Sequence, residues 1–350
     1  VCWGRNDVGQ STVPGFSNLI QVVAGVKHSC ALENTNVVCW GGNDDGQRTV
    51  PELSNAVQVT AGAYHTCALD DTGVVCWGDD FYGQRTVPML INPTQVMAGW
   101  SHTCALDDTG VVCWGDDFYG QTTTAPELSN PTQLTVGGEH NCVLDNTGVV
   151  CWGGNGNMQT TVPVLSNPIK VTTGRANTCA IDDSGVVCWG RDIFGETTPP
   201  TLSNPIQVTE GGSFHTCALD DTGVVCWGSD DSGEISIPTL SNPAYVAAGA
   251  NHVCAIDGTD VICWGNNADG QSVAPNALEF SALGSNLQIN DDFGGDGKAD
   301  ILLRNSSSGQ LFLYEMDGNS IAASNIGGLS LGWNVESIGD FGGDGKVDIL

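Results

Sequence analysis

Pairs of cysteines nine residues apart recur along the first three quarters of this chain and limit what it can fold into. The pairs repeat every 37 or 38 residues, each within a near-copy of HTCALDDTGVVCWG, the sequence of residues 65–78. Such a period is typical of proteins whose units pack against one another, so the repeat and not the 350-residue length sets the architecture. Of the 15 cysteines, only Cys2 falls outside the pattern.

Each near-copy predicts a β-hairpin, because two short valine-rich runs flank a four-residue turn. The fourth turn position is Gly in five units, Asn36 in the first and Asp260 in the last. These residue types tolerate a left-handed backbone, so we expect that conformation at this position. A loop built on a type I turn then places Leu69 opposite Val74.

The hairpin register determines how the cysteines pair. If Leu69 pairs with Val74, then Cys67 pairs with Cys76. A three-residue loop with a glycine bulge would instead put the two cysteines on opposite faces. Directly opposed residues lie about 4.5 to 5.5 Å apart, within reach of a disulfide. We predict seven such disulfides, formed by Cys30 and Cys39, Cys67 and Cys76, Cys104 and Cys113, Cys142 and Cys151, Cys179 and Cys188, Cys217 and Cys226, and Cys254 and Cys263.

Further apolar runs lie on both sides of each hairpin. A unit begins V-x-V-x-A-G and, after the hairpin, continues through a variable loop closing in Gly-Gln or Gly-Glu to a Thr/Val-Pro run. These runs predict about four short strands per unit, and no segment has helical spacing. Both faces of the hairpin are apolar, so neighbouring sheets must cover both. The chain is therefore predicted to be all-β, with its repeats forming a β-propeller.

Units such as AGAYHTCALDDTGVVCWGDDFYGQ, residues 61–84, resemble the repeats of the regulator of chromosome condensation family. In style they are closest to the bacterial β-lactamase inhibitory protein II group. The resemblance covers residues 1–275 and implies a seven-bladed propeller, with seven complete units from about residue 21 and a partial repeat at residues 1–14. The partial repeat is expected to lend a strand to the last blade, or to form an eighth, truncated blade. We expect a processed or partial chain, since it starts in mid-motif.

The composition changes after Pro275, where the cysteines stop. Residues 276–286 are predicted to be a linker, and residues 287–350 contain DDFGGDGKADIL followed by a second copy, GDFGGDGKVDIL. These copies resemble FG-GAP or VCBS-type repeats, whose D-x-D-G-D-G-x-x-D loop binds calcium between two strands. Calcium is therefore the expected cofactor, with Asp side chains and Lys carbonyls as ligands. The predicted ligands are Asp292, Asp296, Lys298 and Asp300 in one loop and Asp340, Asp344, Lys346 and Asp348 in the other. Gly294 and Gly342 stand where this family has Asp or Asn, so each loop lacks one side-chain ligand. An Asp-Gly turn without an ion is the alternative.

All six histidines occupy one repeat position, where the fifth unit has Asn177. A ring of imidazoles could bind a metal, but Asn replaces a hydrogen bond better than it replaces a metal ligand. We therefore expect structural bonding within or between blades. The tryptophan of each Trp-Gly is likewise expected to pack between blades.

Two segments vary within the constant unit: the pair before each histidine and the loop after each Trp-Gly. A rigid framework with variable aromatic loops is typical of a binding surface, and in the inhibitor family, loops on one face of the ring bind the partner. The predicted partner-binding residues are Tyr64, Phe81, Tyr82, Trp100, Phe118, Tyr119, Phe194 and Phe214. The alternative is that these rings pack under neighbouring loops.

Charge and composition restrict the function further. Ten Lys and Arg against 40 Asp and Glu give a net charge of −30, which disfavours nucleic acid and anionic membranes. No apolar run approaches the roughly 20 residues that span a bilayer. Regular cysteines without a common zinc spacing favour an oxidising, extracellular or cell-surface location. With no isolated catalytic constellation, the sequence predicts a secreted, non-enzymatic scaffold that binds a protein or glycan; the alternative is a structural subunit that binds copies of itself. A nucleotide-exchange factor is less favoured.

Overall fold

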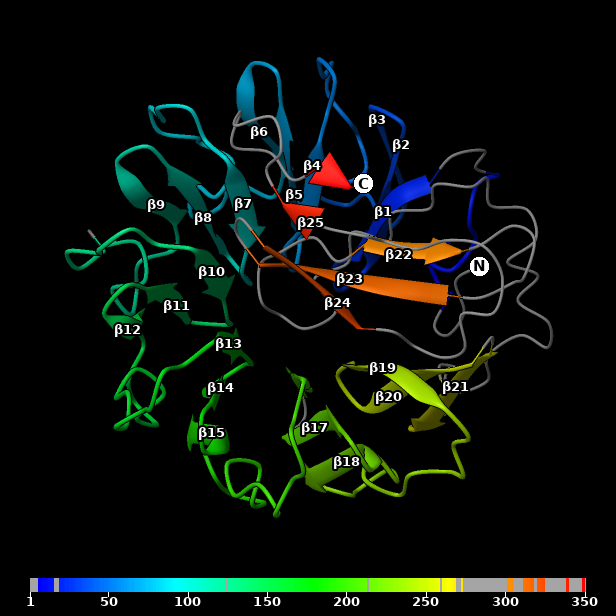
Figure 1. The fold of residues 1–350 in the computed structure, drawn as a ribbon. Helices are drawn as coiled ribbons and strands as arrows, with labels where there is room; N and C mark the ends of the chain where they lie inside the picture. The colour runs from blue at the N-terminus through cyan, green and yellow to red at the C-terminus, as the bar shows by residue number, and fades with distance from the viewer. Residues whose placement is uncertain are drawn as a thin grey trace.

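Seven three-stranded antiparallel sheets follow one another around a central channel in the computed structural model (Figure 1). The structure describes residues 6–15, 19–123, 125–212, 214–258, 260–268 and 272, and the backbone of five later strands. The predicted all-β class and seven blades are confirmed. The described residues contain no helix, and so none that could cross a membrane.

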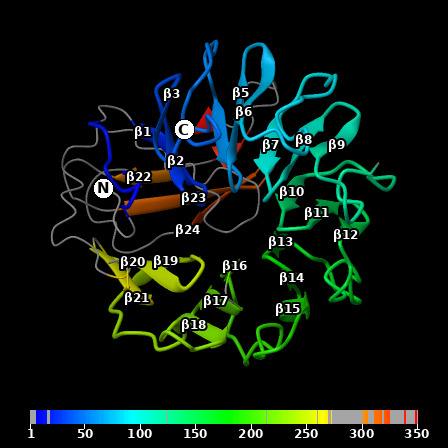
Figure 2. The same cartoon turned by 180° about the vertical axis from the view of Figure 1, so that it is seen from behind.

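The three strands of each blade run from the channel outwards, as the view from behind also shows (Figure 2). The inner strands are β1 (Leu19–Ala24), β4 (Gln58–Ala61), β7 (Gln95–Ala98), β10 (Gln133–Val136), β13 (Lys170–Thr173), β16 (Gln207–Glu210) and β19 (Pro243–Ala248). The middle strands are β2 (His28–Glu33), β5 (His65–Asp70), β8 (His102–Asp107), β11 (His140–Asp145), β14 (Asn177–Asp182), β17 (His215–Asp220) and β20 (His252–Asp257). The outer strands are β3 (Asn36–Gly41), β6 (Gly73–Gly78), β9 (Gly110–Gly115), β12 (Gly148–Gly153), β15 (Gly185–Gly190), β18 (Gly223–Gly228) and β21 (Asp260–Gly265).

The hairpins have the predicted register. Leu69 opposes Val74 and Cys67 opposes Cys76, and the same pairing recurs in every blade. A disulfide joins the two cysteines of each hairpin, with Cα atoms 4.0 or 4.1 Å apart. Each disulfide therefore joins the middle and outer strands of one blade, and none joins two blades among the described residues.

The turn prediction was right for the glycine units and wrong for the first and last. Gly73 has a left-handed φ of 115°, but in the first and seventh blades the positive φ lies on Asn34 (54°) and Gly258 (63°). The glycine units need a φ near 115° here, which is far from the left-handed value of about 57° that Asn and Asp tolerate. Only glycine adopts it, so with Asn36 and Asp260 the turn takes its positive φ two residues earlier. The pairing is unchanged, because Glu33 still opposes Asn36.

The prediction of about four strands per unit was also wrong, because the Thr/Val-Pro run forms no strand in any of the seven sheets. A proline lacks the N–H that a ladder needs and fixes its own φ. Val50 and Leu53, in the run between β3 and β4, instead pack against the apolar cluster between blades one and two. The run is apolar because it covers the core from outside.

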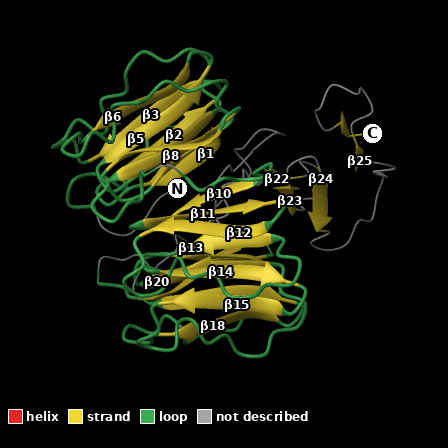
Figure 3. Cartoon of the chain, turned by 90° about the vertical axis from the view of Figure 1, so that its left-hand side faces the viewer, coloured by secondary structure: helices red, strands yellow, loops and turns green. Residues whose placement is uncertain are grey.

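The core lies between blades and not within them. Cys30, Leu32 and Val37 of the first blade form one buried cluster with Val59 and Trp77 of the second, joined by Ala56 and Ala68. Equivalent clusters follow around the ring, and Figure 3 shows neighbouring sheets stacked face to face. Each blade therefore needs its neighbours to bury its apolar faces, as expected for a repeat of this length.

Two polar contacts align neighbouring blades. The Gln21 side-chain oxygen accepts a hydrogen bond from the backbone N–H of Val59 on the next blade at 2.8 Å, and Gln58 does the same for Val96 at 2.9 Å. The indole N–H of each Trp-Gly tryptophan donates to the carbonyl of the loop-closing Gln or Glu of the preceding blade, as Trp77 does to Gln47 at 2.8 Å. The predicted packing of these tryptophans between blades is confirmed.

The partial repeat lies against the first blade. Trp40 donates its indole N–H to the carbonyl of Gln10 at 2.9 Å, as later tryptophans do to the preceding unit. Residues 6–15 contain no strand, and the seventh blade already has its third strand, β21. Residues 1–5, which would carry the lent strand, lie outside the described residues, so that prediction stays open.

Five short strands follow the propeller. One three-stranded sheet contains β22 (Ile301–Arg304), β23 (Leu311–Asp317) and β24 (Ser320–Ser324), and a two-stranded sheet contains β25 (Ile338–Gly339) and β26 (Asp348–Ile349). The proposed linker at residues 276–286 lies outside the described residues, and the domain boundaries stay predictions.

Candidate functional site

The two variable segments of each unit lie together at one end of its blade. In the second blade, the backbone N–H of Asp79, after β6, donates to the carbonyl of Tyr64, before β5, at 3.0 Å. Asp116 and Ser101 make the equivalent bond in the third blade at 2.9 Å. Because β4 and β6 run in the same direction, both segments leave the blade at the same edge. The seven blades bring all of them to one side of the ring, which we call the loop face.

Hydrogen bonds between its own residues fix the loop after each Trp-Gly. In the second blade, Asp79 accepts hydrogen bonds from the backbone N–H of Phe81 at 3.1 Å and the side chain of Gln84 at 2.7 Å. Gln84, which is fully buried, in turn accepts one from the N–H of Tyr82 at 2.9 Å. Sequence reasoning missed this role of the loop-closing Gln, although its presence at the end of six loops was a signal. The aromatic residues are thus presented by a loop of fixed shape.

The second and third blades present the same aromatic pair in the same geometry. Phe81 and Phe118 are each 82% exposed, and Tyr82 and Tyr119 are about half exposed. In both loops the two rings meet edge to face with centroids 4.8 Å apart. An exposed phenylalanine on a rigid loop is costly to keep in water, so its repetition on two adjacent blades favours a binding role.

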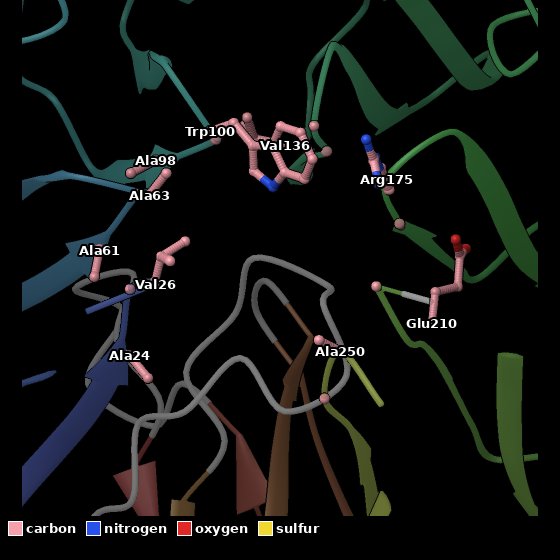
Figure 4. Close-up of a pocket in the computed structure, with 18 of the residues that line it drawn as sticks. Ala24, Val26, Ala61, Ala63, Ala98, Trp100, Val136, Arg175, Glu210 and Ala250 are labelled. Atoms are coloured by element: carbon pink, nitrogen blue, oxygen red, sulfur yellow. The ribbon is translucent and has the colours of Figure 1, made fainter. Parts of the chain in front are cut away.

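The central channel opens among the residues that follow each A-G pair. It encloses a cavity of about 890 Å³ lined mostly by glycine and alanine (Figure 4). The larger lining side chains include Trp100, Arg175 and Glu210. The guanidinium of Arg175 lies over the indole ring of Trp100, 4.6 Å from its centroid. Tyr64, 37% exposed, precedes His65 at the loop face.

The histidines link neighbouring blades. Nε2 of His28 lies 2.8 Å from the hydroxyl of Thr66, and His65, His102 and His140 make the same contact to Thr103, Asn141 and Thr178. Since the hydroxyl of Thr66 donates to the carbonyl of Gln47, it accepts from His28, whose Nε2 therefore carries the proton. The expectation of structural histidines is confirmed for these four.

Burial keeps these imidazoles neutral. It lowers the pKa of His28 to about 4 and that of His140 to about 3, where the neighbouring His102 adds to the effect. A Cβ on Gly25 would lie 2.4 Å from the ring of His28, which explains the glycine at this position, and the same glycine stands three residues before His65, His102, His140 and His252. Among the described residues, no three His, Cys, Asp or Glu side chains gather as a metal site.

Comparison with known proteins agrees with this geometry. The regulator of chromosome condensation (RCC1) repeat model matches five of the seven blades, at residues 19–47, 56–84, 94–121, 207–234 and 244–271. These five blades are RCC1-like repeats. The FG-GAP-like repeat model matches residues 292–350, and no sequence among curated proteins matches the chain.

Solved structures show the same propeller. The CRINKLY WD40 ectodomain of the Arabidopsis thaliana receptor kinase ACR4 is 26% identical, with a TM-score of 0.54 over 71% of this chain and 97% of that one. The ectodomain of the Physcomitrella patens receptor kinase CR4 is 24% identical, with a TM-score of 0.55 over 71% and 73%. Prp20p of Saccharomyces cerevisiae is 18% identical, with a TM-score of 0.51 over 89% and 90%. The finer likeness to the β-lactamase inhibitory protein II group stays a prediction.

The RCC1 repeats are irregular between the fifth and sixth blades. Asn177 replaces the histidine, and Glu210 replaces the alanine that lines the channel in the first three blades. A Cβ on Gly174 would lie 2.4 Å from a carboxylate oxygen of Glu210, at the place where the first blade has the ring of His28. Glu210 thus fills the space that the missing imidazole leaves. Burial raises the pKa of its carboxyl well above the usual value, and the backbone groups of Gly174 and Cys179 counter this only in part.

The next seam, between the sixth and seventh blades, lacks the histidine contact. Val253 stands where the other repeats have Ser, Thr or Asn, and neither ring nitrogen of His215 has a hydrogen-bond partner. Burial lowers the pKa of His215 to about 4. A buried polar group left unpaired costs about 1–3 kcal/mol, so this seam is weaker than those between the first blades.

Phe194 and Phe214 pack against each other on the loop face. Their rings are stacked with centroids 5.7 Å apart, and the guanidinium of Arg191 lies 3.5 Å from the centroid of Phe214. The sixth unit has one extra residue before its histidine, and Phe214 adopts a left-handed φ of 73°. Because both rings already contact neighbours, their role in partner binding is less direct than that of Phe81 and Phe118, and it stays a prediction.

The predicted calcium ligands, except for the backbone of Asp348 in β26, lie outside the described residues. The calcium sites therefore stay predictions. The sequence match to FG-GAP-like repeats covers both predicted loops.

Proposed function

We propose that this chain is an extracellular, non-enzymatic binding protein whose RCC1-repeat propeller holds a partner protein on its loop face. The observation that carries the proposal is the duplicated Phe-Tyr pair: Phe81 and Phe118, each 82% exposed, stand on rigid loops of adjacent blades. Rigid aromatic residues bind with little loss of conformational entropy, so they anchor interfaces efficiently. A net charge of −30 favours a basic partner.

The location is supported by the disulfides. Seven disulfides within one chain are typical of oxidising compartments, and a receptor ectodomain is among the similar structures at 26% identity. A binding role is supported by the histidines, four of which use Nε2 in contacts between blades and are not free for acid-base chemistry.

Affinity capture of secreted and surface proteins tests the proposal, with the double variant Phe81→Ala/Phe118→Ala compared with the wild type. The matched control is Val164→Ala, an apolar residue that is fully exposed but is not in either variable segment. We expect a discrete protein that the wild type and the control capture and the double variant loses. The same captured set for all three would contradict the proposal.

The same variants separate partner binding from self-association. If the Phe-Tyr pairs contact copies of the chain, light scattering will show an oligomer for the wild type and a smaller species for Phe81→Ala/Phe118→Ala. A monomer for both proteins at high concentration would exclude the structural-subunit alternative and leave the heterologous partner.

We also propose calcium as the cofactor of the FG-GAP-like repeats, on the carboxylate spacing around Asp296 and Asp344. Calorimetric titration with Ca²⁺ should give up to two sites in the wild type and fewer in Asp296→Asn. Asp71→Asn, on a propeller turn, is the control and should titrate like the wild type. Absence of heat from calcium binding in the wild type would refute this cofactor without affecting the propeller proposal.

A further inference from the structure

The side chains of Trp100 and Arg175, from the third and fifth blades, contact each other across the fourth blade at the mouth of the channel. Both occupy the repeat position directly after A-G or its equivalent, Trp100 in the third blade and Arg175 in the fifth. The fourth blade has Gly138 at this position, so no side chain separates them, and the guanidinium reaches the indole ring at 4.6 Å. Figure 4 shows both side chains at the wall of the cavity.

Arg175 has no carboxylate partner within the described residues, although acidic residues outnumber basic ones four to one. The two arginine ion pairs found there join Arg85 to Asp80 at 3.0 Å and Arg191 to Glu196 at 3.9 Å. Arg191 is a useful comparison, because it too lies over an aromatic ring, 3.5 Å from the centroid of Phe214. Among the arginines that the structure describes, Arg175 is therefore the one that lies over an aromatic ring without a carboxylate partner.

The surroundings leave room for a small ligand. The cavity of about 890 Å³ is within the range of small-molecule sites, and its wall is mostly Gly and Ala, including Gly137, Gly138 and Ala98. Trp100 is 45% exposed although the guanidinium covers part of it. Glu210, which also lines the wall, has both carboxylate oxygens buried.

We propose that Arg175 and Trp100 form a binding site for a carboxylated sugar, a uronic acid, at the channel mouth. The planar guanidinium binds a carboxylate through two parallel hydrogen bonds. The exposed part of the indole packs against the C–H face of the pyranose ring, as aromatic side chains do with apolar surfaces.

The charge of the protein selects a carboxylate over a phosphate. A net charge of −30 repels anions, and the repulsion grows with the charge of the ligand. A single arginine offsets the one negative charge of a uronate but not the two of a phosphate monoester. Contact between the sugar ring and Trp100 adds affinity that a carboxylate without a ring does not have.

Calorimetric or NMR titration of the full chain tests the site with D-glucuronate, D-glucose and acetate. D-glucose has the ring without the carboxylate, and acetate has the carboxylate without the ring. We expect D-glucuronate to bind at least about tenfold more tightly than either, since a hydrogen bond to a charged group contributes a factor of this size. Glucose or acetate binding as tightly as glucuronate would overturn the proposal, and this test needs no variant.

Variants assign the site to the two residues. Arg175→Gln and Trp100→Ala should each weaken glucuronate binding about tenfold or more, while Arg175→Lys keeps the charge but loses the paired hydrogen bonds and should lose less than Arg175→Gln. Arg191→Gln is the matched control and should bind like the wild type. Unchanged binding in Arg175→Gln, or an equal loss in Arg191→Gln, would overturn the assignment.

An oligogalacturonide distinguishes a polymer source from a free sugar acid. If the uronate belongs to a polysaccharide, the oligomer will bind more tightly than D-galacturonate, and equal affinity will indicate the free acid. The site does not depend on the proposed protein partner, because it rests on Trp100 and Arg175 and not on the Phe-Tyr loops. Failure of one proposal therefore leaves the other unaffected.

Discussion

Nε2 of His65 lies 2.8 Å from the hydroxyl oxygen of Thr103 on the next blade, and both side chains are fully buried. The Thr103 hydroxyl also donates to the carbonyl of Gln84, at 3.4 Å. This side chain of the third blade therefore contacts both the imidazole and the loop-closing residue of the second blade. The contact recurs at successive seams until the fifth blade. The seams, more than the single sheets, are where substitutions should change the stability of the ring.

Thr103→Val should destabilise the propeller, because it keeps the shape of the side chain and leaves Nε2 of His65 buried without an acceptor. We expect the free energy of unfolding to fall by about 1–3 kcal/mol. Urea unfolding followed by tryptophan fluorescence, with disulfides intact, measures the change. Thr86→Val, on an exposed threonine, is the control; equal stability of both variants would show that the seam bond contributes nothing.

Val253→Thr should have the opposite effect. It places a hydroxyl opposite His215, whose ring nitrogens are both unpaired, at the position where five of the other six repeats have Ser or Thr. A gain of about 0.5–1.5 kcal/mol is expected for one added hydrogen bond. The same urea titration tests it, and a loss of stability would mean that the sixth seam cannot accept the geometry of the others.

Asn177→His and Glu210→Ala should be coupled. Alone, Asn177→His would force the new ring into the space that the Glu210 carboxylate occupies, and Glu210→Ala would leave that space empty. Together they recreate the regular seam, with Thr216 in place to accept the hydrogen bond. A double-mutant cycle should therefore give a favourable interaction energy of about 0.5–3 kcal/mol, measured by urea unfolding. Additive single effects would contradict the proposed exchange of roles.

Stability should fall as the pH is lowered from about 6.5, because buried histidines remain neutral in the fold and are protonated in the unfolded chain. Burial lowers the pKa of His65 from 6.5 to about 3, with His102 and His28 adding to the shift. Its contribution is complete above pH 6.5 and decreases towards pH 3, by about 1.4 kcal/mol per pH unit.

His65→Asn isolates this effect. Asparagine does not titrate and already occupies this position in the fifth blade as Asn177. Urea unfolding at several pH values between 7 and 4.5 should show a shallower loss for the variant than for the wild type. The carboxylates of the hairpin turns affect stability at lower pH. Burial raises the pKa of Asp70, but hydrogen bonds from Ser54 and Thr72 lower it overall. The contribution of Asp70 to the free energy of unfolding is therefore lost only in stronger acid. Parallel pH profiles would refute the assignment to His65.

The hairpins could be predicted from the sequence because their geometry is local. The turn between Leu69 and Val74 sets the register, and the register decides that Cys67 faces Cys76. The error at Asn36 has the same local origin: the glycine units take a φ near 115° at this position, a value that glycine adopts and asparagine does not. The Thr/Val-Pro run was mistaken for a strand because apolar composition does not distinguish a ladder from a cover over the core.

The repeat period, the disulfide pairs and the position of the variable segments were determined by the sequence itself, since each depends on residues within one unit. The tertiary structure decided what depends on neighbouring units. It pairs His65 with Thr103, places Glu210 in the space beside Asn177, and brings Arg175 to Trp100 over Gly138. These contacts join residues 33 to 75 positions apart, so the packing of one blade against the next determines which side chains meet.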